Sequence, residues 1–331
     1  MKENDGSKLG IGVEGDRRNF LKVAAAATAG FAATGADTDK MASSIPQGPE
    51  VEPGKMPMIQ LGNKRVSRLI MGANPHWGGA HRGRLLGTMM HEWYTPTRIL
   101  ETLHHAERCG ISAWQTSIHL HLPEIWNQYK SEGGTMDLII LVHPFRKFNL
   151  IGEPTWNGGA REQILDLKPL ALVQHGSVTD DLWKQGRLAE VRDIIKRHRD
   201  EGVLVGCSSH QPDAISQIED EGWDIDFFMT CFYQITKFAE DWKRENGFRP
   251  MHEMYTDCMP DKMTAVVRQV SKPCLGFKIL AAGRIDRKPA IEKAYEYALQ
   301  HIKKTDGVIV GMFPKFSDQI AEGANYVIKY G

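Results

Sequence analysis

The sequence has few cysteines, no excess of charge of either sign, and almost no apolar run of membrane length. Its five cysteines are odd in number and lack the close spacing of metal-binding or redox pairs, so we expect free thiols. Lys plus Arg and Asp plus Glu number 41 each, which gives no basis for a nucleic-acid or anionic-membrane partner. The expected partner of this 331-residue chain is therefore a small molecule.

The apolar run closest to membrane length lies near the N-terminus, and it has the features of an export signal. Arg17-Arg18 precedes Phe20-Leu21-Lys22, an alanine-rich stretch covers residues 23–33, and small residues follow it. This order resembles a twin-arginine signal. We predict a signal peptide at residues 1–36, a flexible spacer at 37–56 and a mature domain at 57–331. The twin-arginine translocase would export the folded chain to a bacterial periplasm, with no membrane span in the mature protein.

From Met58 onward, short apolar runs alternate with helical patterns, as in proteins with a parallel sheet. One helical pattern begins at Thr95-Pro96, a cap followed by a first-turn proline, and ends before Gly110. Residues 153–166 are an exception, because Pro154 and two glycines favour a loop with only a short helix. The apolar runs cover residues 68–73, 112–117, 138–143, 170–175, 203–208, 227–233, 274–280 and 307–312. Eight runs predict an α/β fold, the (β/α)8 or TIM barrel.

Histidines gather where these strands are expected to end. In a closed βα barrel, functional residues lie at the carboxyl ends of the strands. If the 13 histidines were placed at random, roughly one or two would fall there, whereas six do. They are His76, His119, His121, His143, His175 and His210. The group indicates a site that uses imidazole chemistry.

Several segments, in order and spacing, resemble the aldo/keto reductase family over residues 58–329. They are Ile59-Gln60-Leu61-Gly62, Val66-Ser67-Arg68-Leu69, Ala106-Glu107-Arg108-Cys109-Gly110-Ile111, Glu201-Gly202-Val203, Val205-Gly206-Cys207-Ser208-Ser209-His210 and Val310-Gly311-Met312. The resemblance implies a barrel that transfers a hydride between a nicotinamide and a small carbonyl or alcohol. In that family a tyrosine donates the proton, a lysine and an aspartate tune it, and a histidine orients the substrate oxygen.

Only part of that catalytic set is present. The resemblance places the family's histidine at His175, but Gln115 stands at the aspartate position and His143 at the lysine position. Leu120 stands at the tyrosine position, next to His119. Losing the general acid costs about 10²–10⁴ in rate. Because imidazole titrates near neutral pH, we expect His119 or His143 to transfer the proton instead.

The resemblance also implies NADP or NAD as cofactor. Tyr233 stands where the family stacks a tyrosine on the nicotinamide, and Ser208 and Ser209 stand at its carboxamide. The segment 280–283 resembles the pyrophosphate loop, and the start of the last helix would hold the adenosine phosphate. Lys278 lies in an apolar strand, where a lysine needs an anionic partner. The predicted cofactor-binding residues are Ser208, Ser209, Tyr233, Lys278, Gly283, Lys315, Ser317 and Gln319.

Two other functions remain open. Imidazoles of His119, His121, His143 and His175 would suit a metal-dependent hydrolase or isomerase, although carboxylates are scarce at the strand ends. Our first hypothesis needs no metal. The missing tyrosine also allows a barrel that binds a ligand without catalysis. Tryptophans expected in loops favour a sugar-like ligand, and the long connection 234–259 is a candidate lid.

Overall fold

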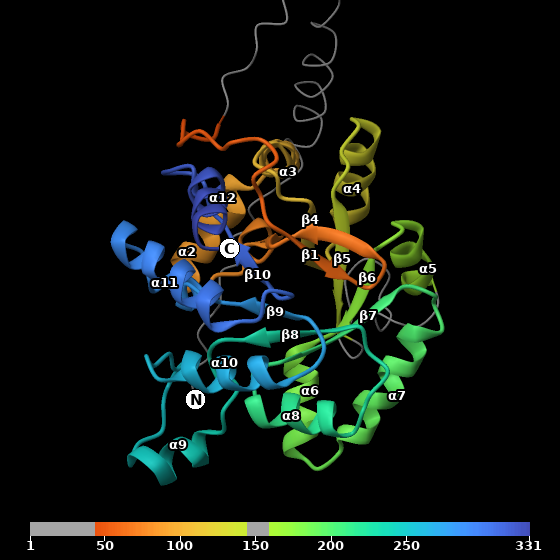
Figure 1. Cartoon of the computed structure of the whole chain (residues 1–331), viewed down its shortest axis with the longest axis vertical. Coiled ribbons are helices and arrows are strands. Elements are labelled where there is room, and N and C mark those ends of the chain that lie inside the picture. Colours follow the sequence, from red (N-terminus) through yellow and green to blue (C-terminus); the bar gives the residue numbers. More distant parts are fainter. Residues whose placement is uncertain (1–43, 144–158) are drawn as a thin grey trace, which may run out of the picture. The chain divides into compact units, whose positions relative to one another are not determined.

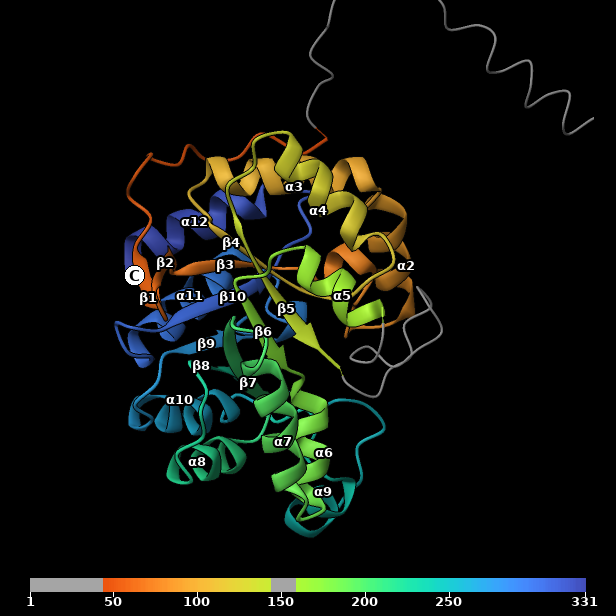
Figure 2. The ribbon, with the colours of Figure 1, turned by 90° about the vertical axis from the view of Figure 1, so that its right-hand side faces the viewer.

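The computed structural model describes residues 44–143 and 159–331, and these ranges contain a closed barrel of eight parallel strands (Figure 1). The strands follow one another in the order β10-β3-β4-β5-β6-β7-β8-β9. Helices surround the strands, as Figure 2 shows from the side. The predicted (β/α)8 barrel is therefore confirmed. The predicted signal peptide and the first part of the predicted spacer lie outside the described residues.

The eight strands of the barrel coincide with the eight predicted apolar runs. Two strands end more than one residue earlier than predicted: β8 ends at Cys231, and β9 ends at Phe277, just before Lys278 takes a left-handed φ of 60°. A ninth and a tenth strand form an antiparallel hairpin ahead of the barrel. The bounds are β1 Met58–Leu61, β2 Lys64–Ser67, β3 Leu69–Gly72, β4 Ala113–Ser117, β5 Asp137–Val142, β6 Ala171–Gln174, β7 Leu204–Ser209, β8 Phe227–Cys231, β9 Cys274–Phe277 and β10 Gly307–Gly311.

The helices lie between the strands, and some connections contain more than one. The sequence did not lead us to expect the additional helices α2, α6 and α9, which lie in the connections after β3, β6 and β8. None of the helices in the described ranges combines the length and apolar character that crossing a membrane requires. The bounds are η1 Pro75–Trp77, α2 Arg84–Trp93, α3 Pro96–Arg108, α4 Leu122–Ser131, α5 Gly159–Asp166, α6 Gly176–Lys184, α7 Leu188–Arg199, α8 Pro212–Asp220, α9 Ala239–Asn246, α10 Met259–Gln269, η2 Ala281–Gly283, α11 Lys288–His301 and α12 Gln319–Tyr330.

Local sequence signals explain where the elements begin. The hydroxyl of Thr95 accepts a hydrogen bond from Arg98 N at 3.3 Å, and Pro96 fills the first turn of α3, as predicted. Strands such as β6 and β8 are buried along their whole length, because the barrel interior covers one face and helices cover the other.

The hairpin β1–β2 closes the amino-terminal end of the barrel. Its apolar residues Ile59, Leu61 and Val66 belong to the same buried cluster as the inward-facing residues of β3 to β10. This closure leaves the carboxyl ends of the strands as the mouth of the barrel, where the predicted site residues lie.

Residues 44–56, the second part of the predicted spacer, lie against the barrel. Ile45 and Met56 are buried, and Ser44 N donates to Glu101 Oε1 on α3 at 2.7 Å. The side chain of Asn325 on α12 donates to the carbonyl of Glu50 at 3.0 Å. The packed part of the chain therefore extends upstream of β1. All five cysteines are free, and only Cys258 is exposed.

Arg68 joins the start of the barrel to its end. Its guanidinium is buried and donates to four backbone carbonyls near the end of the chain. The acceptors are Asp306 O at 2.9 Å, Gly331 O at 2.7 Å, Lys303 O at 3.0 Å and Leu299 O at 3.4 Å. Burial lowers the pKa of Arg68, and the nearby Asp306 carboxylate opposes that shift.

Replacing Arg68 with Met should destabilise the protein by about 3–5 kcal/mol, because the change keeps the volume but leaves buried carbonyls without donors. Urea unfolding followed by circular dichroism measures this loss. The matched control is Arg65→Met on the exposed part of β2, which we expect to change the unfolding free energy by less than about 0.5 kcal/mol. Equal effects of the two changes would contradict the role of Arg68.

Candidate functional site

Two predicted catalytic histidines lie side by side at the mouth. His143 directly follows β5 and His175 directly follows β6, and their ring centroids are 4.9 Å apart. His175 also caps α6, because its Nδ1 accepts a hydrogen bond from Ser177 N at 3.2 Å. Gln115 is buried in the neighbouring strand β4, paired with Gly72 of β3 and Ile139 of β5. The structure therefore brings the imidazoles of His143 and His175 together.

His119 lies in a different environment. Its ring stacks on Trp77 with centroids 4.1 Å apart and planes 10° apart, and Trp77 Nε1 donates to Thr116 Oγ1 at 2.9 Å. Burial lowers the pKa of His119, and the neighbouring His121 and His91 lower it further. Among the described residues, its buried Nδ1 has no hydrogen-bond partner. His119 thus packs on a tryptophan face in surroundings that favour its neutral form.

A buried carboxylate supports the next strand end. Asp180 of α6 is fully buried, and four polar groups surround its carboxylate. Ser209 Oγ lies 2.5 Å from its Oδ1, and His210 N lies 3.1 Å from the same oxygen. His210 Nδ1 and Thr236 Oγ1 lie 2.7 Å and 2.8 Å from Oδ2. This set of donors offsets the cost of burying a charged group.

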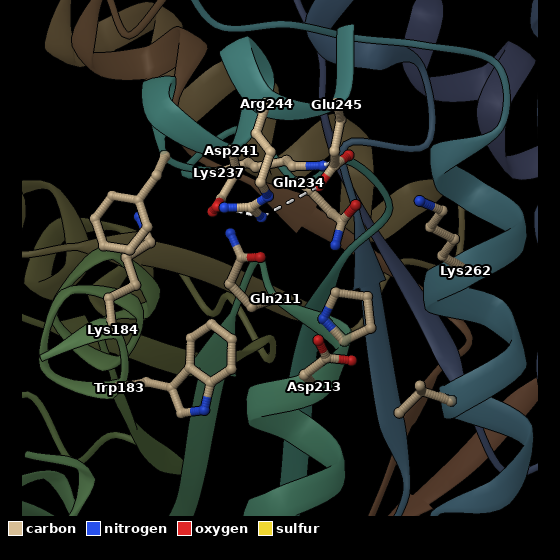
Figure 3. Close-up of a pocket in the computed structure, with 13 residues that line it drawn as sticks. Trp183, Lys184, Gln211, Asp213, Gln234, Lys237, Asp241, Arg244, Glu245 and Lys262 are labelled. Carbon is tan, nitrogen blue, oxygen red and sulfur yellow. Dashed lines mark hydrogen bonds and ion pairs between the residues drawn. The ribbon is translucent and has the colours of Figure 1, made fainter. Parts of the chain in front are cut away.

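The same network continues to an outer cleft. Gln211 Nε2 donates to Thr236 Oγ1 at 2.8 Å, and the side chain of Gln211 also lines a cleft of about 530 Å³ (Figure 3). Trp183 and Phe238 are aromatic walls of this cleft, whose ion pairs include Lys237 with Glu245. The lining comes from α6, α8, α9 and α10 and from the connections before α8 and α9, with no residue of a strand, so the cleft lies outside the ring of strands.

The residue predicted to stack on a nicotinamide is covered. Tyr233 is 6% exposed, and Tyr255 from the long connection after β8 lies over it with ring centroids 5.0 Å apart. Burial raises the pKa of Tyr233 to about 12. Arg284 in turn lies over the Tyr255 ring, 3.8 Å from its centroid.

An ion pair holds this connection to the loop after β3. His81 Nδ1 lies 2.9 Å from Glu253 Oε2, and Tyr255 Oη donates to the same oxygen at 3.0 Å. Burial acts to raise the pKa of Glu253, but the hydrogen bond and charge of His81, together with the charge of Lys278, lower it overall. The predicted lid therefore lies over Tyr233 in this structure.

The remaining predicted cofactor residues near β7 and β9 are buried or in contact with other side chains. Ser208 is 1% exposed, and Ser209 is fully buried against Asp180. Lys278 directly follows the last residue of β9, with its Nζ 5.4 Å from the ring centroid of Phe277. The charges of Lys278 and Glu253 interact, so Glu253 is the anionic partner that the sequence predicted for Lys278.

The predicted pyrophosphate loop has an unusual backbone. Ala281 and Ala282 have φ of 49° and 52°, a region that non-glycine residues rarely adopt, and Gly283 has φ of 81°. Such strain persists where surrounding contacts impose it and is frequent at ligand sites. Here Arg82 Nη1 donates to Gly283 O at 2.6 Å, which ties this loop to the loop after β3.

A carboxylate lies where an adenosine phosphate was predicted. Asp318 caps α12 by accepting from Ala321 N at 3.0 Å, and it pairs with His105 at 2.8 Å. The hydrogen bond to Asp318 raises the pKa of His105 to about 9. Gln319 Oε1 accepts from Phe313 N at 2.8 Å. Lys315 and Ser317 are half-buried just ahead of the helix. A phosphate at this helix start would meet the charge of Asp318.

The metal alternative gains no support from the described part of the chain. Within residues 44–143 and 159–331, no three His, Cys, Asp or Glu side chains gather in a way that could hold a metal ion.

Sequence reasoning missed Asp180, Glu253 and His81. Asp180 lies on the same side of its helix as the buried residues Gly176 and Thr179, and a carboxylate at a buried position needs a partner. Glu253 and His81 lie in irregular connections, where no periodicity indicates which residues meet.

No family model matches the sequence, and no curated protein matches it. Solved structures with a similar fold include a glycerol dehydrogenase from Gluconobacter oxydans, with a TM-score of 0.47 and 13% identity over 81% of this chain and 89% of that one. They also include a truncated 3-deoxy-D-arabino-heptulosonate 7-phosphate synthase from Thermotoga maritima, with a TM-score of 0.47 and 11% identity over 82% of this chain and 89% of that one. Likenesses this distant concern the fold alone and select no activity.

Proposed function

We propose that the mouth of the barrel is a proton-transfer site for a small carbonyl or alcohol substrate, with His143 and His175 as the residues that move the proton. The observation that carries this proposal is their arrangement: two imidazoles end adjacent strands, with ring centroids 4.9 Å apart, at the open end of the barrel. Imidazole is the side chain best suited to donate and accept protons near neutral pH.

Each histidine has a distinct part in this proposal. Ser177 N fixes Nδ1 of His175 as an acceptor, so the ring hydrogen of neutral His175 is on Nε2. That hydrogen can be donated to a substrate oxygen as negative charge develops on it. His143 lies close enough to act on the same substrate and to stabilise or exchange the proton.

The first candidate reaction is hydride transfer with NADP or NAD, in which the histidines would supply or accept the proton. The resemblance to aldo/keto reductases favours it. The strained loop at Ala281 and Ala282 and the lysines Lys278 and Lys315 favour a bound phosphate. The other residues do not fit the dinucleotide as they are arranged here, because Tyr255 covers Tyr233 and the Asp318 carboxylate caps α12. We therefore assign no catalytic step to a nicotinamide.

The covered Tyr233 favours a second candidate, proton transfer without a cofactor. Removing a proton next to a carbonyl and returning it to a neighbouring atom needs only an acid and a base. The mouth contains imidazoles for both tasks. A substrate of this kind would be a small hydroxylated carbonyl compound, which includes sugar-like molecules.

We also propose that the chain works in a bacterial periplasm after twin-arginine export. The support is the sequence alone, through Arg17-Arg18 and the apolar stretch that follows them.

Changing His143 or His175 to Ala should lower kcat by about 10²-fold or more, because each change removes a proton-transferring group. The assay screens small hydroxylated aldehydes, ketones and alcohols with NADP(H), with NAD(H) and without cofactor. His104→Ala on α3, a surface histidine paired with Glu132, is the control and should keep full activity. Full activity of both site variants would refute the proposal.

Changing Tyr255 to Ala should strengthen the binding of NADP(H) or NAD(H) by about fivefold, because it removes a competing ring contact of about 1 kcal/mol from Tyr233. Isothermal titration calorimetry measures this, and adding Tyr233→Ala should cancel the gain. Phe248→Ala, an exposed aromatic in the same connection, is the control. Absence of binding to both the parent protein and the Tyr255 variant would leave the cofactor-independent candidate.

Changing Arg17 and Arg18 together to Lys should leave uncleaved protein in the cytoplasm, because the paired arginines are the feature that the translocase recognises. Immunoblots of periplasmic and cytoplasmic fractions measure the distribution. Lys22→Arg, a change outside the pair, should be exported normally. A periplasmic, processed double-lysine variant would show that another feature directs the chain.

A further inference from the structure

One residue that lines the outer cleft has its side-chain amide held in a single orientation. Thr236 Oγ1 donates its hydrogen to Asp180 Oδ2 at 2.8 Å, so this hydroxyl can only accept from Gln211 Nε2, which lies 2.8 Å away. Gln211 N in turn donates to Ser209 Oγ at 3.0 Å. The amide nitrogen of Gln211 therefore faces Thr236, and its amide oxygen Oε1 is left for another donor.

This amide oxygen is an acceptor without a donor. Gln211 is only 6% exposed, and its side chain extends into the space that the other lining residues enclose (Figure 3). Among the described residues, the one hydrogen bond of this side chain is the bond that Nε2 donates. An unpaired acceptor at an almost fully buried position is costly, and a group that enters the cleft can supply the missing donor.

The lining carries one more positive side chain than negative ones. Its four cations are Lys184, Lys237, Arg244 and Lys262, and its three carboxylates are Asp213, Asp241 and Glu245. Lys237 and Arg244 pair with carboxylates of α9. Lys262 forms no ion pair within the described ranges, and Lys184 donates to the backbone carbonyl of Thr236 instead of a carboxylate. The surplus of positive charge suits a ligand with one anionic group.

The acceptors of the cleft suit hydroxyl groups better than ammonium groups. Asp213 lies in the first turn of α8, where the helix dipole stabilises a carboxylate without a cationic ligand. A ligand ammonium group would add to the surplus of positive charge, whereas a hydroxyl donates to Gln211 Oε1 without adding charge.

The cleft also has apolar walls and the size of a small-molecule site. Trp183 Nε1 donates to Gln217 Oε1 at 3.0 Å, which holds the indole in place. Lys184 Nζ lies 4.2 Å from the ring centroid of Phe238 and covers part of that ring, so Trp183 is the freer aromatic wall. Aromatic walls pack against the carbon chain of a ligand. The volume of about 530 Å³ lies within the range of roughly 300–1,000 Å³ that is usual for small ligands.

We propose that the outer cleft binds a small hydroxylated carboxylate of the sugar-acid class. A hydroxyl of the ligand donates to Gln211 Oε1, its carboxylate lies near Lys262, and its carbon chain packs on Trp183. This second site lies outside the ring of strands and goes beyond the proposed function, because binding here requires no reaction at the mouth.

The deciding experiment compares three six-carbon compounds by isothermal titration calorimetry. D-gluconate has both the hydroxyls and the carboxylate, D-glucitol lacks the charge, and hexanoate lacks the hydroxyls. We expect gluconate to bind at least about threefold more tightly than either of the others, because each of them loses one kind of interaction. Equal affinity of the three compounds, or no saturable binding of gluconate below about 10 mM, would overturn the proposal.

Two substitutions locate the binding in the cleft. Gln211→Met removes the acceptor at similar volume and should weaken gluconate about three- to tenfold, whereas Gln300→Met, at an exposed amide on α11, should not. Lys262→Met should weaken gluconate about two- to fivefold, whereas Lys243→Met, at an exposed lysine of α9 outside the lining, should not. Unchanged affinity in both Gln211→Met and Lys262→Met would refute the site.

A spectroscopic signal and the mouth variants separate this site from the proposed active site. In ¹H–¹⁵N spectra, gluconate should shift the indole N–H signal of Trp183, which Trp183→Phe assigns. His175→Ala should bind gluconate as the parent protein does. A Trp183 signal that stays in place, or loss of gluconate binding in His175→Ala, would show that gluconate binds elsewhere, whereas inactivity of the mouth would leave this proposal standing.

Discussion

A barrel can present a mouth only if its first and last strands pair, and in this protein that closure depends on a buried arginine. The pairing of β3 with β10 joins Leu69 to Val308, residues far apart in the sequence. Arg68 adds hydrogen bonds to carbonyls of the turn before β10, of Leu299 near the end of α11 and of Gly331, which follows α12. Burial makes these bonds strong, and it also makes the guanidinium costly to leave unpaired.

The same cost of leaving a buried polar group unpaired also shapes the candidate site at the mouth. Several polar groups buried there, such as the Asp180 carboxylate and Ser209, have partners that restrict them. Ser177 N donates to Nδ1 of His175, whereas the Asp180 carboxylate lies 2.7 Å from Nδ1 of His210, so the two rings have partners of opposite kind. The cofactor side shows the opposite outcome, because there the partners of Tyr233 and of the α12 start occupy the positions that a ligand would need.

The sequence was sufficient to predict the strands and the barrel, because apolar periodicity and the spacing of turns are local properties. It also placed His143 and His175 at adjacent strand ends, since strand order in a (β/α)8 barrel follows chain order. It did not reveal that Tyr255 covers Tyr233 or that Asp180 holds His210. These contacts join an irregular connection or a helix face to a strand end, and their geometry depends on the packed structure and not on local pattern.

The pairing of β3 with β10 also sets an order of events in folding. The strands β4 to β9 can each pair with a neighbour close in the chain, whereas one edge of β3 has its partner only after β10 has been synthesised. Loop-closure entropy makes such distant pairing slow. Until it forms, the open edges of β3 and of the growing sheet are exposed to association with other chains. The aggregation risk of this protein should therefore be concentrated in the interval between the synthesis of β3 and the arrival of β10.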